Sequence, residues 1–173
     1  MLFSSSLYPC WLEIGFSGLS GPSLRWLFKI LYQYQMKLTN NFSLHEFLDS
    51  RFFNEAEQKR VKESYRDNTF ELEPNLIILA DNLQVLRDHL DARIDINISY
   101  RPKWYELSRG RSGTSQHVEL KAADIVVKGM EAEDVFKEIQ KLIEEGKMKE
   151  GGLGRYNSFT HYDVRGTKAR WNG

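Results

Sequence analysis

The sequence predicts an α+β domain, one that combines helices with strands, and three patterns indicate it. Apolar residues recur at helical spacing between Leu76 and Leu90, and again along 130–143. Segment 94–100 instead alternates apolar and polar side chains, which is typical of a strand. With 173 residues, 41% hydrophobic and 28% charged, the chain is long enough to bury the core of one domain.

Charge and cysteine content exclude some classes of protein. Lys+Arg and Asp+Glu both number 24, so the formal net charge is zero, and a protein that wraps nucleic acid through a basic face is not expected. Cys10 is the single cysteine, which excludes an intramolecular disulfide and a cysteine-rich metal site. Any metal must therefore be held by histidines and carboxylates.

The first 35 residues differ in composition from the rest and form an atypical leader. They are rich in Ser, Leu and aromatic residues, and Arg25 is their first cation, so they lack the basic start of a secretory signal. Three interpretations remain open: a non-native translated leader, a disordered or packing appendage, and a membrane-associating segment. No apolar run is long enough for stable membrane insertion. Met36 opens the expected domain, 36–173.

Helices are predicted in order along the first half of this domain. Ser43 is a plausible N-cap that forms a capping box with Glu46, and Phe42 and Phe47 could staple that turn to the core. A charged, exposed helix is expected over 54–66. The main core helix is then expected to begin at Glu73-Pro74, since proline is tolerated in a first turn.

The second half alternates strands with one helix. After the strand at 94–100 we expect a loop over 103–114, a strand region opened by His117, and a helix over 130–143. The glycines of 151–154 predict a turn. Segment 156–164 is predicted to be the last strand, ended by Gly166.

Two short segments carry the residues that suggest chemistry. His117 and Asp124 lie seven residues apart, so a bend at 119–121 is needed to bring them together. His161 and Asp163 share one face of a strand because side chains alternate. A catalytic zinc usually takes three protein ligands and keeps a fourth position for water, and His117, Asp124 and His161 would supply those ligands. Taken alone, the spacing of His117 and Asp124 is a weak signal, because such pairs occur by chance and a buried histidine hydrogen-bonded to an aspartate explains them without a metal.

The residues around these positions resemble those of a known family. Ser115-x-His117 followed by Ala122-x-Asp124 is similar to the first zinc motif of the D-Ala-D-Ala metallopeptidases, which include D-alanyl-D-alanine carboxypeptidases and L-alanyl-D-glutamate endolysins. Segments 151–156 and 159–166 resemble the second motif, in the branch described as a peptidase C-terminal domain. Ser-Tyr-Arg at 99–101 is similar to the segment that precedes the first motif. The resemblance covers 38–173.

The resemblance implies a small antiparallel sheet that carries a zinc site, with helices packed on one side, as in hedgehog and DD-peptidase folds. It implies Zn²⁺ as the cofactor and three ligands: His117, Asp124 and His161. Arg101 would bind a substrate carboxylate, for which a planar bidentate donor is suited, or else form a surface ion pair. Ser115 and Gln116 would orient substrate or bound water, or only shape the turn.

The sequence departs from the family pattern at two positions. Several members carry the catalytic base three residues before the last histidine, where this chain has Ser158. Asp163 is then the nearest carboxylate on the same face, and it is expected to act as the base or to orient a ligand. Leu120 stands where the family usually has glycine.

The resemblance implies a zinc peptidase that hydrolyses stem peptides of bacterial peptidoglycan, as a DD-carboxypeptidase or endopeptidase, acting as a monomer without nucleic acid. The protein would be synthesised in the cytoplasm. It would act on the cell wall after release or as part of a phage particle. The alternative is a catalytically weak wall-binding or phage tail-associated module that retains a structural zinc.

Overall fold

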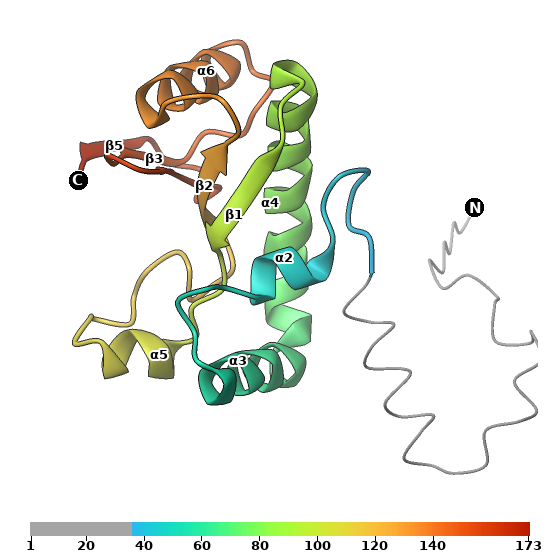
Figure 1. Cartoon of the computed structure of the whole chain (residues 1–173), viewed down its shortest axis with the longest axis vertical. Coiled ribbons are helices and arrows are strands. Elements are labelled where there is room, and N and C mark those ends of the chain that lie inside the picture. Colours follow the sequence, from blue (N-terminus) through green and yellow to red (C-terminus); the bar gives the residue numbers. More distant parts are fainter. Residues whose placement is uncertain (1–35) are drawn as a thin grey trace, which may run out of the picture. The chain divides into compact units, whose positions relative to one another are not determined.

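The computed structural model describes residues 36–173, and the predicted leader at 1–35 lies outside the described residues. Helices and strands mix along this part of the chain, so the α+β class is confirmed (Figure 1). The elements are α2 (Leu44–Leu48), α3 (Glu55–Asp67), α4 (Thr69–Leu90), β1 (Ile94–Ile98), α5 (Lys103–Ser108), β2 (Ala122–Val127), α6 (Ala132–Glu144), β3 (Gly152–Arg155), β4 (Thr160–Asp163) and β5 (Ala169–Asn172).

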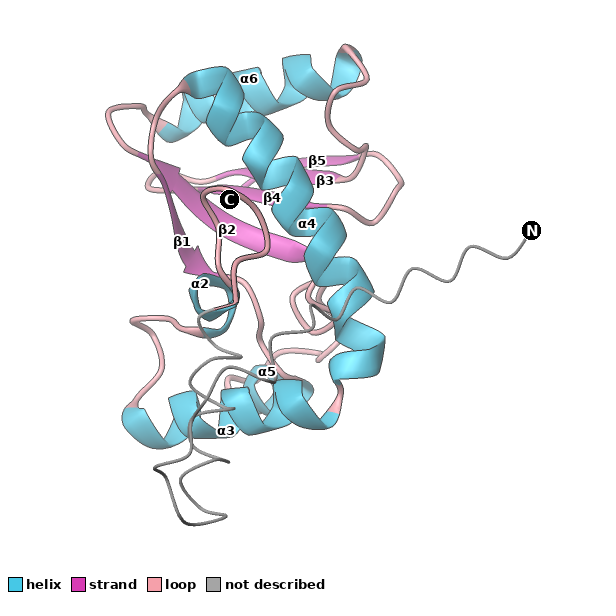
Figure 2. Ribbon diagram, turned by 90° about the vertical axis from the view of Figure 1, so that its right-hand side faces the viewer, coloured by secondary structure: helices cyan, strands magenta, loops and turns pink. Residues whose placement is uncertain are grey.

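The strands form one five-stranded sheet in the order β1-β2-β4-β3-β5. Three neighbouring pairs are antiparallel, as expected, whereas β3 and β5 run parallel and make the sheet mixed. Ile125 of β2 and Tyr162 of β4 join a core with side chains of α4 and α6, so these helices cover one face, and α4 crosses it (Figure 2). The opposite face is free to carry polar groups.

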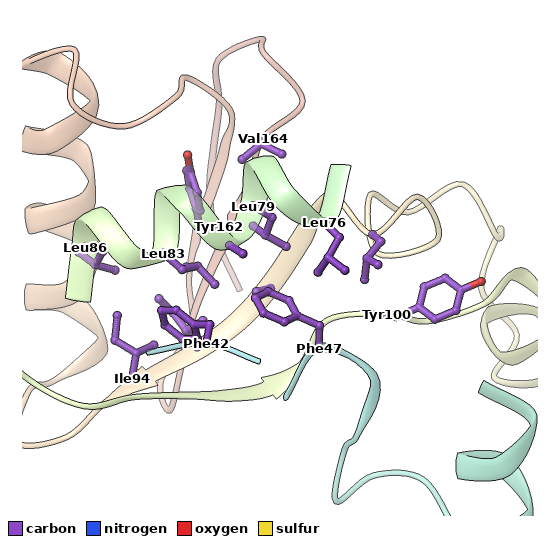
Figure 3. Packing of buried hydrophobic residues seen from close by; sticks show 14 of the residues in the cluster. Phe42, Phe47, Leu76, Leu79, Leu83, Leu86, Ile94, Tyr100, Tyr162 and Val164 are labelled. Carbon is purple, nitrogen blue, oxygen red and sulfur yellow. The ribbon is translucent and has the colours of Figure 1, made fainter. Parts of the chain in front are cut away.

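Helix α4 supplies the centre of the core, as its apolar spacing predicts. Leu76, Leu79, Leu83 and Leu86 are fully buried along one side of the helix, which faces Phe42 and Phe47 (Figure 3). Burial of each leucine stabilises the fold by about 1.5–3 kcal/mol. Within 36–173, neither α4 nor any other helix combines the length and the apolar character needed to cross a membrane.

The capping box at the start of α2 is confirmed. The Ser43 N–H donates to Glu46 Oε2 at 2.7 Å, and the Phe42 and Phe47 rings meet edge to face with centroids 6.1 Å apart. The predicted start of α4 at Glu73-Pro74 is wrong, because the helix begins at Thr69. Pro74 is the sixth residue of the helix, where it lacks the N–H that would bond to the Phe70 carbonyl, so here a proline lies inside a helix and does not mark its start.

The loop predicted over 103–114 contains α5 in its first half. Apolar periodicity cannot reveal a six-residue helix, which tertiary contacts stabilise instead. The Trp104 indole N–H donates to Ser64 Oγ at 2.9 Å, the Arg60 guanidinium lies 4.1 Å from the Trp104 ring, and Tyr105 is buried. These contacts fix the segment between β1 and the candidate site.

The glycine-rich segment predicted as a turn is strand β3, and it pairs with a strand, β5, that was not predicted. A Cβ on Gly152 would lie 2.2 Å from Asp163 Oδ2, and one on Gly154 would lie 2.4 Å from Trp171 Cε2. The glycines therefore allow side chains of β4 and β5 to lie against the strand. The prediction of a single last strand over 156–164 is wrong, because β4 spans only Thr160–Asp163 and β5 follows Gly166.

Candidate metal centre

Three side chains from separate segments meet on the sheet face opposite α4. Asp124 lies in β2 and His161 in β4, and the two residues are direct partners across this antiparallel pair. His117 lies in a turn that precedes β2, and not at the start of a strand as predicted. The turn returns the chain over the sheet, because the Lys121 N–H donates to the Gln116 carbonyl at 3.0 Å. Side-chain alternation places Asp124 and His161 on one face, as expected.

Leu120 bends the backbone of this turn through its left-handed conformation, within the segment 119–121 where a bend was predicted. Its φ of 54° lies in the left-handed region that favours glycine, yet its side chain is fully buried in the core. The conformation costs about 1–2 kcal/mol. Burial of the side chain offsets that cost, since replacing a buried leucine by alanine destabilises by about 2–5 kcal/mol.

Replacement of Leu120 separates these two contributions. We expect Leu120→Ala to lower the free energy of unfolding by about 2–5 kcal/mol, because it loses the packing and keeps the strained φ. Leu120→Gly should be more stable than Leu120→Ala by about 1 kcal/mol, because it releases that strain. Urea unfolding of both variants measures the difference. Equal stabilities, or a less stable glycine variant, would show that the turn stores no strain at this residue.

Two of the three distances between the facing atoms match a tetrahedral zinc site. His117 Nε2 lies 3.3 Å from His161 Nδ1 and 3.4 Å from Asp124 Oδ1, and His161 Nδ1 lies 2.8 Å from Asp124 Oδ1. Bonds of about 2.0–2.1 Å to zinc imply about 3.3–3.4 Å between ligand atoms at tetrahedral angles. Two distances agree with this, and the third needs a shift of about half an ångström. The cluster could therefore hold a metal ion.

The other nitrogen of each imidazole is bound to an acceptor. His117 Nδ1 lies 2.7 Å from the Ser99 carbonyl oxygen, which can only accept a hydrogen bond, so this nitrogen carries the proton. His161 Nε2 lies 3.1 Å from Asp163 Oδ2. When each imidazole is neutral and carries its proton on this outer nitrogen, the lone pairs of His117 Nε2 and His161 Nδ1 are directed at the shared centre. Outer partners of this kind orient histidine ligands in metal sites.

The protonation equilibria of the cluster follow from burial and mutual contact. Burial lowers the pKa of His117, which favours the neutral form. For His161 burial acts in the same direction, but hydrogen bonds to Asp124 and Asp163 outweigh it and raise the pKa. Burial would raise the pKa of Asp124, yet its contacts with both histidines bring it well below its usual range. Asp124 is therefore an anion, as a metal ligand must be.

Asp163 is fully buried and surrounded by donors. Its Oδ1 accepts from the Gly152 N–H at 2.9 Å, and Arg165 binds both oxygens, with Nη2 at 2.5 Å from Oδ2. Burial alone would raise its pKa, but the hydrogen bonds from His161 and Arg165 bring the pKa far below the usual value. The side chain is therefore a fixed anion that fixes the ring of His161.

A cleft of about 500 Å³ opens beside the cluster and contains the residues predicted to bind substrate: Arg101, Ser115 and Gln116. Arg101 Nη2 donates to Ser115 Oγ at 3.3 Å, and Arg101 Nη1 lies 3.7 Å from Asp124 Oδ2. Gln116 Oε1 is buried without a hydrogen-bond partner among residues 36–173. An acceptor of that kind suits a ligand N–H.

Aromatic residues from the C-terminal segment form another wall, which the sequence did not reveal. Tyr156 and Phe159 stack with centroids 4.3 Å apart, and the Trp171 ring lies 5.0 Å from that of His161. The Trp171 indole N–H donates to the Tyr156 hydroxyl at 3.0 Å. The close approach of Gly154 to Trp171 allows this arrangement. Arg111 and Arg165 also line the cleft without having been predicted.

Comparison with known proteins gives one match. The sequence model of a protein family described as Peptidase M15 matches residues 52–163, more than half of the 173-residue chain. The matched segment contains His117, Asp124 and His161 and ends at Asp163. No curated protein and no solved structure matches the chain.

Proposed function

Because this chain belongs to the peptidase M15 family, we propose that it is a zinc-dependent peptidase that hydrolyses stem peptides of bacterial peptidoglycan. The observation that carries the proposal is the convergence of two histidine nitrogens and one carboxylate oxygen beside a cleft. We assign His117, Asp124 and His161 as the ligands of one Zn²⁺. Two nitrogens and one oxygen are a donor set found in catalytic zinc sites with an open fourth position. The peptidase domain spans 36–173.

Bound zinc would activate a water molecule and polarise the scissile carbonyl group. The chain's own residues bind and orient the peptide. Arg101 lies at the edge of the ligand cluster and presents a planar donor for a substrate carboxylate. Ser115 Oγ accepts hydrogen bonds from Arg101 and from the His117 N–H, so it keeps the arginine beside the turn. Gln116 Oε1 is available to accept from a substrate N–H.

We assign Asp163 to the orientation of His161 and not to proton transfer. Its two oxygens accept from His161, Gly152 and Arg165, and it is fully buried, so substrate cannot reach it. A general base also needs a pKa near the working pH, whereas these contacts hold the pKa of Asp163 far lower.

Digestion of purified cell walls tests the function. We expect the zinc-loaded protein to release shortened stem peptides, which mass spectrometry of the muropeptides detects and assigns to one bond. A chelator should stop the reaction, and added Zn²⁺ should restore it. If intact muropeptides persist with a protein that carries one zinc per chain, the peptidase proposal is wrong.

The peptidase would reach the wall after release from the cell or within a phage particle.

The second candidate is a catalytically weak wall-binding or phage tail-associated module that keeps zinc for folding. It is favoured by Ser158, which is exposed and occupies the position where several relatives carry the base, and by the burial of Asp163. Sedimentation with purified walls separates the two functions. A module of this kind would bind walls with zinc present and release no peptide, and its Tm would fall when zinc is removed.

A further inference from the structure

A buried carboxylate joins two arginines at the edge of the cleft. Glu106 of α5 is 2% exposed, and its Oε1 lies 2.9 Å from Arg101 Nε and 2.9 Å from Arg111 Nη1. The Arg111 N–H also donates to the Glu106 carbonyl at 3.0 Å, which fixes the backbone of both residues together. A carboxylate is rarely buried so completely without charged partners, and here one oxygen accepts a hydrogen bond from Arg111 and forms an ion pair with Arg101.

The two guanidinium groups face the same cleft as the candidate ligands. Arg101 and Arg111 both line it, and the Arg111 side chain is 50% exposed while Nη1 contacts Glu106. Arg101 is more enclosed, with 16% of its side chain exposed, and it also contacts Ser115. Glu106 therefore holds the enclosed guanidinium close to the accessible one, and both can reach a ligand in the cleft.

The charge of this group limits what it can bind. Two guanidinium groups and the Glu106 carboxylate carry one net positive charge, and the neighbouring Asp124, 3.7 Å from Arg101 Nη1, is assigned to the zinc. Arg165, the third arginine of the cleft, is neutralised by Asp163. One unpaired positive charge spread over two planar donors is suited to a single carboxylate, which arginine binds through paired N–H groups.

We propose that Arg111 binds the substrate carboxylate together with Arg101, and that Glu106 is the positioning residue for both. The inference rests on the proposed peptidase function and deepens it. The substrate is then a peptide with a free carboxylate near the scissile bond. The same peptide with a carboxamide at that position is a poor substrate, because an amide brings no charge and presents N–H donors to the guanidinium groups.

Three synthetic stem pentapeptides of the lysine type test this selectivity: the unmodified peptide, its C-terminal carboxamide, and its glutamate carboxamide. The two carboxamides show whether the arginines bind the C-terminal carboxylate or the glutamate carboxylate. We expect the wild-type protein to cleave one of the carboxamides with a kcat/KM about 10- to 100-fold below that of the unmodified peptide. In Arg111→Ala, the ratio of kcat/KM for the unmodified peptide to kcat/KM for that carboxamide should fall to a few-fold, mainly through a higher KM for the unmodified peptide.

Arg109→Ala is the matched control, because Arg109 is an exposed arginine two residues away that pairs with Glu57 instead. It should keep the wild-type ratio. Glu106→Gln should raise the KM for the unmodified peptide and leave the zinc content at one per chain, as expected of a positioning residue. The double variant Glu106→Gln/Arg111→Ala should show a ratio no larger than that of Arg111→Ala, because Glu106 also positions Arg101.

Two failures are distinguishable. If the wild-type protein cleaves neither cell walls nor any of the three peptides, the peptidase function is wrong and this inference falls with it. If it digests walls but cleaves none of the three peptides, the function stands and the carboxylate site is wrong. If it cleaves all three equally well, or if Arg111→Ala keeps the wild-type ratio, the function stands and the carboxylate site is wrong.

Discussion

Replacement of Asp124 by asparagine is expected to abolish both zinc binding and peptide hydrolysis. The carboxylate is the single anion among the three assigned ligands, and Oδ1 lies within 3.4 Å of both histidine nitrogens. Asparagine keeps the shape but loses the charge, so we expect zinc affinity to fall more than about 100-fold, beyond the effect of losing an outer partner. Hydrolysis should fall to background. Competition with a chromophoric chelator measures the affinity.

Asp95→Asn controls for the same chemical change elsewhere in the sheet. Asp95 lies on the neighbouring strand β1, is exposed, and pairs with Arg93. This variant should bind zinc and cleave peptides like the wild-type protein. Unchanged zinc affinity in Asp124→Asn would contradict the assignment of Asp124 as a ligand.

Replacement of Asp163 should weaken zinc binding much more than it slows the bound enzyme. Asp163→Ala removes the acceptor of His161 Nε2 and leaves the Gly152 N–H unpaired. We expect zinc affinity to fall about 10- to 100-fold, as it does when histidine ligands lose their outer partners. The unpaired donors should lower the free energy of unfolding by about 1–3 kcal/mol. At saturating zinc, kcat should stay within about tenfold of the wild-type value.

Asp163→Asn distinguishes the two roles considered for this residue. Asparagine still offers an oxygen to His161, so an orienting residue predicts a smaller loss of zinc affinity than in Asp163→Ala. A general base predicts the opposite pattern, in which zinc affinity is unchanged and kcat falls about 10²- to 10⁴-fold in both variants. That second pattern would restore Asp163 as the base.

Elements that depend on local signals were predictable from the sequence. Each of these signals comes from residues close together in the sequence. They are the leucine spacing of α4, the capping box at Ser43 and the alternation of apolar and polar residues in β1. The family was predictable from the motifs around His117 and His161, and the family match confirms it. Short motifs indicated these residues because a metal site would constrain the types and spacing of its ligands.

Elements stabilised by distant contacts were not predictable. Helix α5 depends on the contact of Trp104 with Ser64, 40 residues earlier. The glycines of β3 are typical of a turn, and only their close approach to Asp163 and Trp171 explains why they form a strand. Arg111 showed no pattern in the sequence, because its partner Glu106 lies in a helix without apolar periodicity.

A crystal structure of the zinc-loaded protein, with anomalous diffraction measured across the zinc absorption edge, tests the assignment of the three metal ligands most directly. We expect one anomalous peak bonded to His117 Nε2, His161 Nδ1 and an Asp124 carboxylate oxygen, at the usual distances of about 2.0–2.2 Å, with a fourth position open to solvent. A zinc peak bound elsewhere, or no peak between these three side chains, would contradict it.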